Sequence, residues 1–182
     1  MNTFKFVSLA MIAVAATAIA QTPPLAAAHG RGVVQNQGGG KAEFGFEVAK
    51  RMVDGTVRVR GNLNFATMPG EGGDGGRTRP VVRISTDRLE RLVIAEDNPK
   101  AGSFGGPAVL ARIGANGNVE RIQGVVSVNV ADNRNPDSDP TVRKDGFRIQ
   151  FNVRGEGGTP RTIFTFAGAV VRGDLVVRST SN

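Results

Sequence analysis

The sequence predicts an all-β fold, an antiparallel β-sandwich or partly open barrel of about eight to nine strands. Apolar and polar residues alternate with a period of two along most of the chain, as in strands with one buried face. Turn signals built from glycine, proline, Asp and Asn recur about every ten to fifteen residues. No stretch shows the capped apolar stripe of a helix. Together these three observations favour short antiparallel strands.

Alternation justifies the strands of the first half one by one. The segment 41–48 places apolar residues at even positions, and Asp54-Gly55 then marks a turn. The segment 57–65 places them at odd positions and predicts a second strand. β-branched residues predict a third strand at 81–86. A fourth is expected at 89–95, where the spacing also fits a helical turn.

The second half repeats the pattern after a glycine- and proline-bearing connection at 98–107. A strand at 108–113 leads to Asn116-Gly117, the best hairpin turn in the sequence. A turn is expected at Arg172-Gly173 as well. The remaining predicted strands are 125–131, 147–153, 163–171 and 175–178.

The first residues have the layout of a secretory signal peptide. Lys5 precedes an uncharged, mostly apolar run at 6–20, which is short for a permanent anchor of about 20 residues. Small residues permit cleavage after Ala20 or after Ala28, and the sequence leaves both open. We expect a signal peptide at 1–28, a flexible glycine-rich lead-in at 29–40 and a single β domain at 41–182. This predicts a secreted protein, extracellular or periplasmic, with no transmembrane segment after processing.

The composition excludes several classes of function. The 182 residues contain no Cys, Trp or Tyr and a single His, with 23 Lys and Arg against 16 Asp and Glu. The absence of Cys removes disulfide scaffolds, thiolate metal sites and Cys nucleophiles. A lone His29, outside any periodic segment, is a poor catalytic base and cannot form a multi-histidine metal site. We therefore expect no conventional catalytic apparatus and no cofactor other than calcium.

Three separated segments resemble the post-COAP domain, a secreted bacterial β module found beside choice-of-anchor surface domains. They lie at 38–48 (GGG followed by FGFEV), at 128–147 (VNVADN, a later proline, then DGF) and at 167–177 (AGAV followed by GDLVV). The central loop departs from the family's Asp-Asn-Gly-Glu-Pro-Gly, and Arg178 stands near its closing His. The resemblance implies an extracytoplasmic all-β domain without established catalytic activity, with a surface or interaction role, and it supplies no active-site residues.

An acidic loop follows the predicted strand 125–131. Carboxylate and amide oxygens are the donors that calcium prefers. The loop lacks the glycine of an EF-hand, and neighbouring basic residues oppose a dication. An Asx turn explains the same residues, so both interpretations stay open. The candidate calcium ligands are Asp132, Asn133, Asn135, Asp137 and Asp139.

Arginine supplies most of the positive charge, and much of it falls at polar positions of predicted strands. Such a face can pair with phosphate, sulfate or carboxylate groups of an anionic polymer, and an ordinary solvated sheet face is the alternative. Nucleic acid is not expected, because exposed aromatic residues do not interleave with the arginines. The candidate anion-binding residues are Arg58, Arg60, Arg83, Arg148 and Arg154.

Other motifs carry less weight. The Gly-x-Gly-x-x-Gly match at 70–75 has a strand, not a helix, predicted after it, so it does not indicate a nucleotide site. Arg172-Gly173-Asp174 matches an integrin motif but is interpreted as a hairpin turn. A glycosidase would need two facing carboxylates. The sequence does not select a pair from Asp87, Glu90, Glu96, Asp97, Glu120 and Asp145.

The leading functional prediction is a secreted, non-catalytic β module with an extracellular structural or interaction role, whose arginines bind anionic polysaccharide or cell-envelope components. Two alternatives stay open: a calcium-assisted binding domain, and a carboxylate-dependent hydrolase of secreted polysaccharide.

Overall fold

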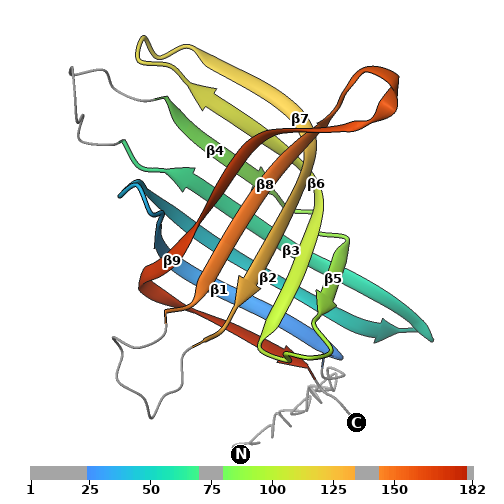
Figure 1. Ribbon diagram of the computed structural model, residues 1–182. Helices are drawn as coiled ribbons and strands as arrows, with labels where there is room; N and C mark the ends of the chain where they lie inside the picture. The colour runs from blue at the N-terminus through green and yellow to red at the C-terminus, as the bar shows by residue number, and fades with distance from the viewer. Residues whose placement is uncertain (1–23, 70–79, 134–143, 180–182) are drawn as a thin grey trace, which may run out of the picture.

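The computed structural model describes residues 24–69, 80–133 and 144–179. These residues contain nine strands and one short turn of 3₁₀ helix (Figure 1). The strands are β1 (Ala26–Gln35), β2 (Lys41–Val53), β3 (Thr56–Thr67), β4 (Val81–Thr86), β5 (Arg91–Ile94), β6 (Ala101–Ile113), β7 (Val119–Ala131), β8 (Gly146–Arg154) and β9 (Pro160–Ser179). The 3₁₀ turn η1 (Glu156–Gly158) joins β8 to β9.

The strands form one antiparallel sheet that closes into a barrel. Their order is β4-β3-β2-β1-β9-β8-β7-β6-β5, and a further pairing of β4 with β6 closes the first eight strands of that order. The long strand β6 makes this possible, because residues 109–113 pair with β4 while residues 102–105 pair with β5. The predicted all-β fold is confirmed. Of the two predicted architectures the barrel is the observed one, and it is closed rather than partly open.

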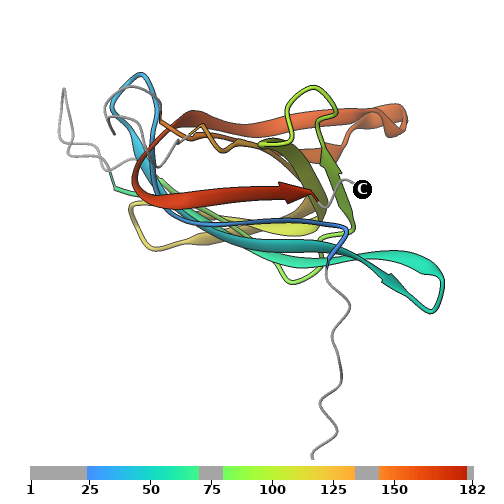
Figure 2. The same cartoon turned by 90° about the horizontal axis from the view of Figure 1, so that it is seen from below.

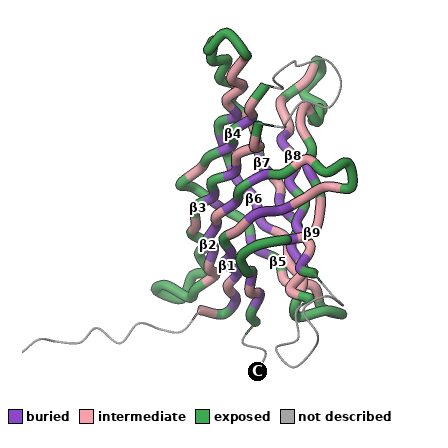
Figure 3. The backbone as a smooth tube through the Cα atoms, turned by 90° about the vertical axis from the view of Figure 1, so that its left-hand side faces the viewer, coloured by how far each residue is buried: buried purple, intermediate pink, exposed green. Residues whose placement is uncertain are grey.

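Phenylalanines fill the barrel interior, as expected for eight strands, whose lumen is just wide enough for side chains. The Phe147 ring is central, with its centroid 4.7 Å from that of Phe44 and 6.1 Å from that of Phe65. Phe104 packs 4.7 Å from Phe46 on the other side of the cluster. Figure 3 shows buried and exposed residues alternating along the strands, which is the period-two pattern of the sequence. Apolar burial between the two halves of the wall therefore holds the barrel together.

The expected lead-in at 29–40 is wrong for residues 29–35, because β1 occupies Ala26–Gln35 and pairs with both β2 and β9. Its glycines look like linker residues in the sequence, yet they make room for larger neighbours. A Cβ on Gly30 would lie 2.9 Å from the Phe46 ring. Ala26 and Ala28 face the same interior and are buried. The strand thus contributes small residues where its neighbours contribute large ones.

The expected connection at 98–107 is also wrong over most of its length, since β6 begins at Ala101. Its glycines mark close backbone approach, not a loop. A Cβ on Gly105 would collide with the carbonyl oxygen of Val126 on β7, and one on Gly106 with that of Arg88. Glycine inside a strand often has this meaning.

The expected turn at Arg172-Gly173 is wrong as well, because β9 runs without a break from Pro160 to Ser179. The strand curls around the end of the barrel (Figure 2). Val171 is the extra residue of a β-bulge, because Val33 pairs with Arg172 and the adjacent Val34 with Val170. The Arg172-Gly173-Asp174 motif therefore lies within a paired strand and not at a hairpin tip.

The position of β1 favours one of the two cleavage sites of the predicted signal peptide. Cleavage after Ala28 would remove three strand residues, two of them buried, and their pairing with Lys50, Val48 and Val177. We therefore expect the mature protein to begin at Gln21, as intact-mass measurement of the exported protein would show. A mass that places His29 first would contradict this. A chain truncated to start at His29 is expected to melt at a lower temperature than one starting at Gln21.

Candidate anion-binding surface

The five arginines predicted to bind anions do not form one face. Arg58 and Arg60 lie on the outer face of β3, and Arg83 lies on β4. Its partner Ala66 is eight residues along β3 from Arg58, about 25 Å at the rise of a strand. Arg148 lies on β8, four strands around the barrel from β3 and thus on the opposite side. Arg154 ends β8 beside η1.

Arg58 and Arg60 instead join two arginines that the sequence analysis missed. Arg58 pairs directly with Arg51 on β2. Arg60 begins a row that continues through Ala49 and Ala27 to Arg178 on β9. Directly paired residues point to the same side of a sheet, so all four guanidinium groups share the outer face. We call Arg51, Arg58, Arg60 and Arg178 the arginine rows.

The arginine rows have the exposure and charge that anion binding requires. All four arginines are exposed, and neither row contains a carboxylate. Among the described residues, ion pairs join Arg88 to Glu90 and Arg112 to Glu120, and none involves the four. Like charges directly opposite across two strands destabilise a sheet, so an anion bound between Arg51 and Arg58 would relieve a repulsion present in the free protein.

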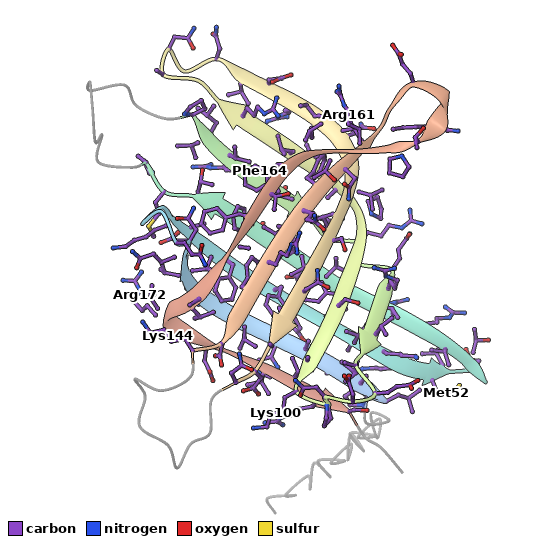
Figure 4. All side chains as sticks on the ribbon, in the orientation of Figure 1. Met52, Lys100, Lys144, Arg161, Phe164 and Arg172 are labelled. Atoms are coloured by element: carbon purple, nitrogen blue, oxygen red, sulfur yellow. The ribbon has the colours of Figure 1, made fainter. Side chains whose placement is uncertain are left out.

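The shape of the surface adds to this. Only the small side chains of Ala49 and Ala27 separate Arg60 from Arg178, which are three strand spacings or about 14 Å apart. The β2–β3 hairpin that carries the other arginines extends beyond the barrel, with Met52 near its tip (Figures 1, 2 and 4). A linear polymer can therefore reach both rows without meeting another part of the described fold.

A second group of arginines surrounds Arg31 further along the same wall, but carboxylates balance it. Two adjoining hollows of about 540 and 380 Å³ share Arg31 and are lined by Arg83 and Arg172 respectively. Glu43 lines both, and Asp174 pairs with Arg31 in the register of β1 and β9. This mixed charge favours an anion less than the arginine rows do.

The opposite wall is largely uncharged and isolates Arg148. Arg148 lies between Asn129 and Ala167 in its row, and the next row contains Ser127, Gln150 and Thr165. Arg148 therefore cannot act together with the arginine rows on one short ligand. Its predicted role as part of a common face has no support in the geometry.

The candidate calcium loop is described only at its start. Asp132 and Asn133 lie just after β7, whereas Asn135, Asp137 and Asp139 fall outside the described residues. The backbone N–H of Asn133 donates to Oδ1 of the buried Asp145 at 3.0 Å. Within the described ranges, no group of three or more His, Asp or Glu side chains is arranged to hold a metal ion. Calcium binding stays a prediction.

Burial raises the pKa of the Asp132 carboxyl, and the negative charge of Asp145 raises it further. The folded protein thus holds the proton on Asp132 more tightly than the unfolded chain does. The resulting stabilisation is present below the ordinary pKa of 3.8 and is lost as the pH rises through the pKa of Asp132 in the folded protein. We expect Asp132→Asn to melt at a higher temperature than the wild type at pH 7, with the difference shrinking towards pH 3. Asp97→Asn makes the same change at an exposed carboxyl and is expected to change the melting temperature little. A lower melting temperature for Asp132→Asn at pH 7 would contradict the account.

The remaining motifs fall at separate places. Glu90 and Glu120 are engaged by arginines, with Arg88 Nε 2.6 Å from Glu90 Oε1 and Arg112 Nη1 3.5 Å from Glu120 Oε2. His29 is exposed on β1, opposite Glu47. The glycine motif at 70–75 is outside the described residues. No helix in the described ranges has the length and apolar character to cross a bilayer.

Comparisons with protein-family models, with curated proteins and with solved structures find no match to this chain. The resemblance to the post-COAP domain therefore stays a prediction that rests on the three quoted segments.

Proposed function

We propose that this protein is a secreted, non-catalytic barrel that binds anionic polymers of the cell envelope or its surroundings through the arginine rows. The observation that carries the proposal is the grouping of four exposed arginines in two rows that contain no carboxylate: Arg51, Arg58, Arg60 and Arg178. Guanidinium groups pair bidentately with carboxylate, sulfate and phosphate, so an acidic polysaccharide offers matching chemistry at successive units.

The packed interior supports a surface role. Phe44, Phe65, Phe104 and Phe147 occupy the lumen and are buried, which leaves the outer face as the place where a polymer can bind. Binding along an exposed face is electrostatic and is screened by salt, with a Debye length of about 10 Å at 0.1 M. The complex is therefore expected to form and dissociate readily with changes in ionic strength.

Chromatography on heparin tests the proposal. The mature protein is expected to be retained at low salt and to elute as the salt concentration rises. Arg58→Glu with Arg60→Glu is expected to elute at a clearly lower salt concentration, because the two substitutions reverse charge in both rows.

The matched control makes the same change of net charge on the opposite wall. Arg121→Glu with Arg148→Glu alters two exposed arginines of β7 and β8 and leaves the arginine rows intact. We expect this control to elute close to the wild type. Equal losses in the two double variants would show that overall charge, not the rows, governs retention, and would overturn the proposal.

A further inference from the structure

Two hairpins diverge at one end of the barrel and leave a cleft between them. β7 pairs with β8 only from Val125 and Asn152 onwards, so residues 119–124 separate from the end of β8. A Cβ on Gly124 would lie 2.6 Å from the Phe151 ring, which places the point of divergence where β7 passes closely over β8. Figure 1 shows the β6–β7 and β8–β9 hairpins pointing apart. The cleft has a volume of about 620 Å³, within the range of small-molecule sites.

The cleft combines an apolar floor with a cationic rim. Ile122, Val153 and Ile163 line it and pack against the barrel core while remaining partly exposed. Arg112, Arg154 and Arg161 line it as well, and Glu120 is the one carboxylate among its lining residues. Figure 4 shows Arg161 on the part of β9 that belongs to the β8–β9 hairpin, far from Arg172 on the same strand.

The arginines are not equivalent. Arg112 joins the two walls, because Nη2 donates to the carbonyl oxygen of Ile163 at 3.3 Å while Nη1 lies 3.5 Å from Glu120 Oε2. Arg154 and Arg161 have no ion-pair partner among the described residues. Arg112 therefore offsets the charge of Glu120 and links the two sides of the cleft. Arg154 and Arg161 remain available for a ligand.

We propose that this cleft binds a small amphiphilic anion, with the anionic head group on Arg161, which pairs directly with Val153, and the apolar body over Ile122, Val153 and Ile163. A purely ionic ligand would leave the apolar floor in contact with water, and a purely apolar ligand would bury cationic groups without a partner. An anion with a short alkyl or aromatic body satisfies both. The site is separate from the arginine rows and does not depend on the proposed polymer binding.

Titration of the isotope-labelled protein with octanoate, followed by NMR, tests this. We expect saturable shifts concentrated at Val153, Thr162 and Ile163. Acetate, which lacks the apolar body, and octylamine, which reverses the charge, are expected to bind at least about tenfold more weakly. Equal binding of octylamine, or no saturable shift with octanoate, would overturn the proposal.

Variants then assign the binding to the cleft. Arg161→Gln is expected to weaken octanoate binding about tenfold with little change in melting temperature, because Arg161 is exposed. Arg121→Gln, on the outer face of β7 beside the cleft residue Glu120, is the matched control and should bind as the wild type does. Retained affinity in Arg161→Gln would contradict the inference. Arg58→Glu with Arg60→Glu should keep octanoate binding, so that this proposal and polymer binding succeed or fail separately.

Discussion

Phe147→Ala is expected to lower the free energy of unfolding by about 3 to 5 kcal/mol, the range for removing a large aromatic side chain from a packed core. Phe147 is 2% exposed, and its ring contacts those of Phe44, Phe46 and Phe65 at centroid distances of 4.7, 6.4 and 6.1 Å. These neighbours come from β2 and β3, on the opposite side of the lumen from β8. The cavity would thus open between the two halves of the wall, where no single hairpin can collapse to fill it.

Urea unfolding measures this loss as a lower midpoint with an unchanged slope. Val125→Ala is the control, because Val125 is 53% exposed on β7 and should change stability by less than about 0.5 kcal/mol. A loss below about 1 kcal/mol in Phe147→Ala would mean that the aromatic cluster does not hold the barrel closed.

Alternation and turn residues correctly predicted two long strands and the tight turns of two hairpins. The alternation at 41–48 and 57–65 lies within β2 and β3. Asp54 and Gly55 have φ of 50° and 73° and form the tight turn that joins them. Gly117 has φ of 79° in the second predicted hairpin. Each of these features requires only a few adjacent residues, so a single sequence contains the information.

Barrel closure could not be predicted in the same way. It depends on pairing between β4 and β6, and pairing register carries no local signature when both strands have the same alternating pattern. The sequence does not predict β1, because its glycines match a linker composition. The reason for small residues lies in neighbours distant in sequence: Phe46 and Leu175 crowd Gly30, and the backbone of Arg172 crowds Gly32.

The candidate site shows the same division. Alternation placed Arg58 and Arg60 on one face, and the two-residue turn at 54–55 already sets Arg51 opposite Arg58. The sequence alone could therefore have identified Arg51. It could not have identified Arg178, because Arg178 reaches the row only through the order β2-β1-β9. Arg83, Arg148 and Arg154 do not join this group. Alternation shows that a residue points outwards, but it does not show on which side of a closed barrel the strand lies.

Gly173→Ala is expected to destabilise the protein by on the order of 3 kcal/mol or more. Gly173 has φ of 93°, a backbone conformation that residues other than glycine rarely adopt. A Cβ there would also collide with the carbonyl oxygen of Arg31 and lie 2.6 Å from the Cα of Gly32. Both contacts are backbone atoms of β1, so no side chain can move aside to relieve them. The bulge at Val171 and the curl of β9 around the barrel depend on this close approach.

Gly45→Ala is the matched control and should have the opposite sign. Gly45 lies within β2, has no positive φ, and a Cβ there would meet nothing within 4 Å. Replacing glycine by alanine at such a site reduces the entropy of the unfolded chain and stabilises by about 0.4 to 1 kcal/mol. Thermal melting of the two variants would therefore move in opposite directions. If Gly173→Ala melted with the wild type, β9 would have to pass β1 at a greater distance, and the Arg172-Gly173-Asp174 segment could then be a turn, as its sequence alone predicts.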